Sequence, residues 1–135
     1  MESWRKVWRE GVSPQLSSRA LEALEHALET DDPTLLQGAT TSPPPLQCVI
    51  DWPAEAACML GYCGWKGEDL ETVGEVEEYF ARICFASDTA MKEPAAVRWL
   101  INWFDDTPRD EMRQLLLAEV RLSMADRERG QLAGV

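Results

Sequence analysis

The chain has 135 residues, an apolar fraction of 45% and a formal net charge of −11. One domain with a buried core fits this length and composition, and a disordered acidic tail does not. The negative field disfavours direct binding to nucleic acid and to anionic membranes, because proteins hold phosphate groups with clustered Lys and Arg.

Helix signals dominate the first part of the chain. Apolar side chains recur at helical spacing over residues 4–8, and Gly11 is the predicted end of that short helix. Ser17 is the predicted N-cap of a second helix, which carries a stripe of leucines on one face. Asp32-Pro33 is expected to stop this helix and to open a short one over residues 33–37.

The middle of the chain breaks the helical pattern. Residues 39–47, ATTSPPPLQ, are predicted to be a proline-rich loop inside the domain, since consecutive prolines favour polyproline II geometry. Residues 46–52 are expected to be coil or an isolated strand, because no strand partner is evident. The next helix is predicted over residues 53–63, opened by its proline and ended by Gly61 and Gly64.

Three more helices are predicted towards the C-terminus. Thr72 and Glu75 have the spacing of a capping box, so a helix is expected to begin directly after Thr72. Residues 94–104 are apolar nearly all round, which predicts a central helix. Residues 108–129 are predicted to form the last helix, ended by Gly130. The predicted fold is therefore all-α, one compact domain of about six or seven helices that spans the whole chain.

Four cysteines could in principle serve as metal ligands or as reactive thiols. Their spacings do not match the two pairs, two to four residues apart, that zinc sites use. We therefore predict buried structural thiols and no cofactor, and expect CMLGYCGWKG, residues 58–67, to be a helix end that turns on its glycines. The alternative is a metal-binding protein or thiol enzyme built on Cys48, Cys58, Cys63 and Cys84, with Cys63 as the preferred nucleophile.

No catalytic residue is predicted. His26 is the only histidine, which excludes the paired histidine motifs of di-iron bundles and of metalloproteases. Asp105 and Asp106 are close enough in sequence for acid–base chemistry or cation binding, but an interhelix turn explains them as well. No glycine-rich nucleotide-binding motif and no nucleophile elbow occurs.

The uneven charge predicts a partner instead. Residues 20–93 hold fifteen acidic and three basic residues, so this segment carries −12. Such a surface attracts a basic protein. Near the N-terminus, tryptophans alternate with basic residues on a short helix, which either anchors a partner or docks on its own domain. The residues predicted to bind the partner are Trp4, Arg5, Trp8, Glu75, Glu77, Glu78, Asp105 and Asp106.

The predicted function is a non-catalytic, acidic protein-binding module. It would be an accessory subunit, an adaptor or an inhibitor of a basic partner, with a mimic of nucleic acid or an immunity-type protein as the extreme form. A homo-oligomeric structural protein with a tryptophan-rich interface is the other alternative. The cytoplasm is the expected location, since neither a secretory signal nor a membrane-spanning segment is evident in the sequence.

Overall fold

Helices make up most of the residues that the structure describes, which are 3–46 and 49–133 of this computed structural model. The helices, in chain order, are α1 (Ser3–Lys6), the π-helix η1 (Val7–Val12), the 3-10 helix η2 (Ser13–Gln15), α2 (Ser18–Thr30), α3 (Met59–Tyr62), the π-helix η4 (Cys63–Gly67), α4 (Val73–Met91), α5 (Val97–Asp106) and α6 (Arg109–Ala133). Two short strands, β1 (Thr41–Ser42) and β2 (Ala56–Ala57), pair antiparallel. The predicted all-α fold is confirmed.

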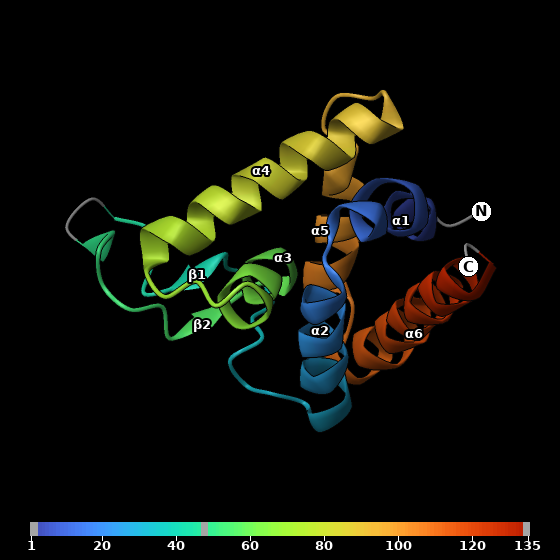
Figure 1. Ribbon diagram of the computed structural model, residues 1–135. Coiled ribbons are helices and arrows are strands. Elements are labelled where there is room, and N and C mark those ends of the chain that lie inside the picture. The colour runs from blue at the N-terminus through green and yellow to red at the C-terminus, as the bar shows by residue number, and fades with distance from the viewer. Residues whose placement is uncertain (1–2, 47–48, 134–135) are drawn as a thin grey trace.

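The helices surround one hydrophobic core. In Figure 1, α4 spans the upper part of the molecule, α2, α5 and α6 lie below and to the right of it, and the strands and α3 lie below its N-terminal half. Within the described residues, no helix is both long and apolar enough to cross a bilayer. The largest fully buried side chains of the helices come from η1, α2, α3, α5 and α6 and include Trp8, Leu21, Leu28, Leu60, Leu100, Phe104 and Leu116.

The N-terminal helix docks on its own domain. Gly11 was predicted to end this helix, and that prediction is wrong. Gly11 lies buried inside η1 against α4, where an added Cβ would be 2.9 Å from the Met91 Cγ. Trp4 is 4% exposed and Trp8 is fully buried. The interpretation of these tryptophans as an exposed anchor is therefore wrong, because both indoles are part of the core that α1 and η1 complete.

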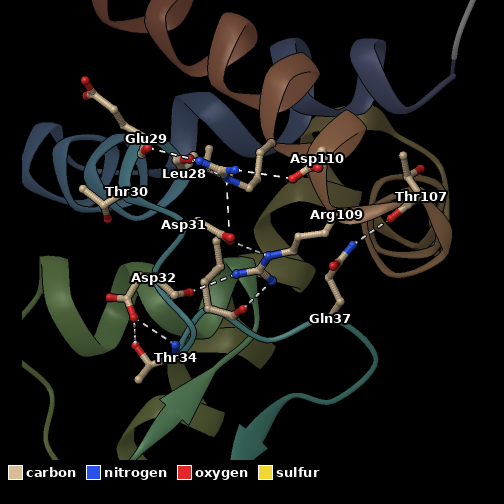
Figure 2. A network of polar contacts seen from close by, with 12 residues as sticks. Leu28, Glu29, Thr30, Asp31, Asp32, Thr34, Gln37, Thr107, Arg109 and Asp110 are labelled. Carbon is tan, nitrogen blue, oxygen red and sulfur yellow. Dashed lines mark hydrogen bonds and ion pairs between the residues drawn. The ribbon is translucent and has the colours of Figure 1, made fainter.

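The segment after α2 is irregular, with turns, bends and one isolated bridge at Leu35, and the predicted helix over residues 33–37 is wrong. α2 begins at its predicted N-cap, Ser17, whose hydroxyl accepts from the Ala20 N–H, and it ends at Asp31 in left-handed geometry. The Arg109 guanidinium then donates to the Asp31 carboxylate at 2.9 Å and to backbone carbonyls of the following segment (Figure 2). These bonds from α6 satisfy carbonyls that a helix would have used internally.

The helix predicted over residues 53–63 starts six residues later than expected, at Met59. Residues 53–57 form backbone pairs instead, since Pro53 forms a bridge with Thr72 and Ala56–Ala57 form β2. Cys58 is the N-cap, with its sulfur 3.5 Å from the Gly61 N–H that donates to it. Long-range pairing has overridden the local preference of an alanine-rich segment.

The glycines of the 58–67 stretch allow close packing and do not form a turn. α3 continues into the π-helix η4, in which Gly64 and Gly67 are both buried. A Cβ on Gly64 would lie 2.7 Å from the Tyr79 ring, and one on Gly67 would lie 2.5 Å from the Ala20 Cα. The helix therefore does not stop at Gly61 and Gly64, as was predicted, because these glycines lie where α4 approaches too closely for a side chain, and Gly67 lies where α2 does.

The capping box at Thr72 and Glu75 is confirmed. The Thr72 hydroxyl accepts from the Glu75 N–H, the Glu75 carboxylate accepts from the Thr72 N–H, and α4 begins at Val73. Backbone N–H groups of Thr72 and Glu71 hold the pKa of Glu75 below its usual value. The two capping side chains are neighbours in sequence, which explains why the sequence predicts this boundary.

The last two helices differ from their predicted bounds. α5 begins at Val97 because the Asp88 carboxylate on α4 accepts from the Ala95 and Val97 N–H groups, at 3.0 and 2.8 Å. It is buried on one face only, so the prediction of a central helix is wrong. α6 runs through Gly130, the predicted end, to Ala133, since Gly130 lies in open space on an exposed helix.

Candidate functional site

The described thiols are not activated for chemistry. Cys58 and Cys63 are buried and Cys84 is half-buried, and all three are free. Burial raises the pKa of Cys58 to about 12, raises that of Cys63 as well, and raises that of Cys84 to about 11. Within residues 3–46 and 49–133, no three His, Cys, Asp or Glu side chains come together to hold a metal ion. Cys48, the fourth predicted ligand, lies outside the described residues.

Slow alkylation of these thiols is the expected result at pH 8. In a Cys48→Ser variant, we expect Cys84 to react with iodoacetamide at least about tenfold more slowly than free cysteine, because its raised pKa leaves little thiolate. Cys58 and Cys63 should react more slowly still, since their sulfurs are also shielded. Mass spectrometry of timed samples measures the three rates, and urea-unfolded protein is the control. A rate for Cys63 above that of free cysteine would restore the thiol-enzyme alternative.

The structure separates the eight predicted partner-binding residues. Trp4 and Asp106 line one cleft between α1 and α5, Arg5 lies on α1, and Asp105 lies on α5 next to Gly38. Trp8 lies in the core, and Glu75, Glu77 and Glu78 lie on the first turns of α4. Several of them already have structural partners. Asp105 lies in the last turn of α5 and accepts from the Gly38 N–H at 2.8 Å, and Glu77 accepts from the Thr41 hydroxyl at 3.1 Å.

A buried carboxylate that the sequence did not reveal binds the N-terminal helix to α6. Glu119 is 4% exposed and accepts from the Arg9 guanidinium at 2.6 and 2.8 Å, with Arg5 at 3.6 Å from it. A groove of about 510 Å³ lies beside this cluster, but its acidic and basic groups face one another. The arrangement is that of a structural ion pair, because the buried charge is paired and hydrogen-bonded.

A second groove is built where the loop over residues 49–55 meets the start of α4. The Ala54 N–H donates to the Glu71 carbonyl at 2.8 Å, and the Val73 and Gly74 N–H groups donate to the carbonyls of residues 52 and 50 at 2.9 and 2.8 Å. Gly74 lies so close to Ile50 that a Cβ there would be 2.6 Å from the Ile50 Cγ1. These contacts position the backbone of the loop against the start of α4.

The groove formed by this loop is acidic. It has a volume of about 600 Å³ and opens between the loop, η4 and the residues that precede α4. Three carboxylates line it, and the ammonium of Lys66 lies 4.0 Å from the centre of the Trp65 ring. Its lining residues are Asp51, Pro53, Ala54, Trp65, Lys66, Asp69, Leu70, Glu71 and Thr72, and we call it the acidic groove.

Exposed carboxylates and apolar side chains border the acidic groove. Lys66 is the single basic residue between Arg19 and Arg82 in the sequence, and Arg19 already pairs with Asp69. Ile50 and Trp52, on the same loop, are 47% and 56% exposed. Four exposed carboxylates, those of Asp51 and Glu55 on the loop, of Glu71 just before α4 and of Glu78 on α4, form no ion pair with any described residue. Acidic and apolar surface thus lie side by side.

Sequence reasoning found only part of this surface. It identified Glu75, Glu77 and Glu78 from their charge, but it missed Asp51 and Trp52, because a helix was predicted to start beside them. The adjacent Asp51 and Trp52, in a segment without basic residues, were the signal in the sequence that could have indicated this surface. No protein-family model matches the chain, no curated protein matches it, and no solved structure matches it.

Proposed function

We propose that the protein is a non-catalytic, acidic protein-binding module, whose acidic groove and Trp52 bind a basic and partly apolar segment of a partner protein. The observation that carries the proposal is the pairing of the 49–55 loop with the start of α4, which brings Asp51 and Glu71 to one groove beside an exposed indole. The module would act as an accessory subunit, an adaptor or an inhibitor of that partner.

The chemistry of this surface favours a peptide with lysine or arginine side chains. Carboxylates attract and steer cations, and the Trp65 ring already has an ammonium over it. Trp52 and Ile50 provide the apolar area that binding energy requires, because interface tryptophans contribute strongly when a partner covers them. A phosphate backbone or an anionic bilayer would meet carboxylates here and be repelled.

The cytoplasm belongs to the same proposal. Three free thiols, those of Cys58, Cys63 and Cys84, occur in the described part of the chain. Thiols stay reduced in the cytosol, whereas oxidising compartments favour disulfides. Self-association through exposed apolar side chains remains the competing class, so the mass of the protein in solution is the first control for every binding measurement below.

Neutralising the carboxylates of the acidic surface is expected to weaken peptide binding about tenfold at low ionic strength. The variant is Asp51→Asn, Glu55→Gln, Glu71→Gln and Glu78→Gln, four exposed residues, and it spares the capping residue Glu75. The probe is an amphipathic peptide of alternating lysine and leucine, measured by isothermal titration calorimetry. Its glutamate-leucine counterpart should not bind.

The matched control changes the same number of charges elsewhere. Neutralising Glu10, Glu22, Glu93 and Glu111, which are also exposed, brings the net charge from −11 to −7 in both variants. The control should bind the peptide within about twofold of the parent, if position and not total charge decides. Equal weakening in both variants would reduce the proposal to non-specific attraction and overturn it.

Salt and Trp52 separate the two parts of the proposed contact. Between about 0.01 M and 1 M salt the screening length falls from about 30 Å to about 3 Å, so the carboxylate contribution should disappear. Trp52→Ala should still weaken the residual binding at high salt, whereas Trp99→Ala, which removes an equally exposed indole from α5, should not. If neither the higher salt concentration nor the Trp52→Ala substitution weakens peptide binding, a contact at this groove is contradicted.

A further inference from the structure

A second cleft lies on α5, away from the acidic groove. It has a volume of about 510 Å³ and runs between α1 and the outer face of α5. Trp99 precedes Asn102 and Trp103 by three and four positions, and Asp106 follows them by four and three, so these four residues of α5 form a single stripe on the helix surface. The lining residues are Ser3, Trp4, Trp99, Asn102, Trp103, Asp106 and Thr107, and we call the site the indole cleft.

The indoles of this cleft are arranged in layers. The rings of Trp4 and Trp103 are stacked, with centroids 3.6 Å apart and planes within 6° of parallel. The guanidinium of Arg5 lies over the Trp4 ring, 4.8 Å from its centroid. The chain therefore already contains a guanidinium placed on one member of this indole stack, which is the geometry of a cation–π contact.

The outer part of the cleft combines exposed indole surface with a carboxylate. Trp103 is half-buried, and Trp99, one helical turn before it, is 59% exposed. Asp106 is exposed at the other end of the stripe and forms no ion pair with a residue in the described ranges. Two indoles and a carboxylate thus border one opening, and a carboxylate next to aromatic faces selects for a flat cation.

We propose that the indole cleft binds an arginine side chain of a partner protein, with the guanidinium against the indoles of Trp99 and Trp103 and its N–H groups donating to the Asp106 carboxylate. Arginine fits better than lysine, because its planar group stacks on aromatic faces and donates two parallel hydrogen bonds to a carboxylate. An anionic ligand is disfavoured by Asp106 and by the net charge of −11. The site is separate from the acidic groove and does not depend on it.

The test uses a short peptide with one arginine flanked by glycines and follows the indole N–H resonances of ¹⁵N-tryptophan-labelled protein. The resonances of Trp99 and Trp103 should shift in a saturable way, and Trp99→Ala should weaken binding about five- to thirtyfold. A citrulline peptide has almost the same shape without the charge, so it should bind at least about threefold more weakly than the arginine peptide. Asp106→Asn should remove most of that difference.

Two control variants locate the effect. Trp52→Ala removes an indole that is 56% exposed at the other site. This variant and the four-carboxylate variant of the acidic groove should both leave the peptide affinity measured on the Trp99 and Trp103 resonances unchanged, since those resonances report the indole cleft. These controls make failure of this proposal distinguishable from failure of the proposed function. Equal affinity for arginine and citrulline, shifts centred on Trp52, or no saturable shift of the Trp99 resonance would each overturn the assignment.

Discussion

Replacing Gly67 with alanine is expected to lower the free energy of unfolding by about 3 kcal/mol. The new Cβ would lie 2.5 Å from the Ala20 Cα and 2.9 Å from the Ala20 backbone nitrogen. Both are main-chain atoms of α2, so no side-chain rotation can relieve the overlap, and η4 must move away from α2. That movement opens the core between the two helices, where interiors are normally packed at crystal density.

Gly130→Ala is the matched control for this substitution. Gly130 lies inside α6 with no atom within 4 Å of an added Cβ, and its φ is not positive. The same chemical change there should raise the free energy of unfolding by up to about 1 kcal/mol, because alanine favours the helix over glycine. Urea unfolding monitored by circular dichroism measures both variants. A Gly67→Ala protein as stable as the parent would contradict the close approach of η4 and α2.

Boundaries set by neighbouring residues were predictable from the sequence. Ser17 and Thr72 cap α2 and α4 as expected, since a capping side chain bonds to the backbone three residues ahead. The apolar periodicity of α2 likewise gave its buried face, with Leu21, Leu24 and Leu28 all fully buried. Each of these features is decided within one or two helical turns.

Boundaries set by distant residues were not predictable. Residues 33–37 are irregular and not helical because Arg109, more than 70 residues away, bonds to the carbonyls of Asp32 and Leu35. Residues 53–57 are alanine-rich but pair with Thr72 and with β1. No local pattern encodes such partners, and tertiary contacts of this kind routinely override helix propensity.

The candidate sites divide along the same line. The charge of the 20–93 segment predicted an acidic surface, but only the backbone pairing of the 49–55 loop shows that Asp51 and Glu71 share a groove. The tryptophan pattern predicted an exposed anchor at Trp4 and Trp8, and the burial of both side chains contradicts that prediction. Trp4 and Trp8 have the helical spacing of both an exposed anchor and a core face, whereas Trp52 and Trp99 are the exposed indoles.

Trp8→Ala is expected to lower the free energy of unfolding by about 4 kcal/mol, among the largest effects of any single truncation in this chain. The Trp8 side chain is fully buried, and its indole N–H donates to the Ser123 hydroxyl at 3.0 Å, which joins η1 to α6. Truncation leaves a cavity in the core, and Trp8→Phe, which keeps most of the ring, should cost less than half as much.

Trp99→Ala removes the same atoms from the surface and should change stability by less than about 1 kcal/mol. Urea unfolding of the three variants decides the point. If Trp8→Ala is no less stable than Trp99→Ala, the N-terminal helix is not docked, and Trp8 returns as a candidate anchor for the partner.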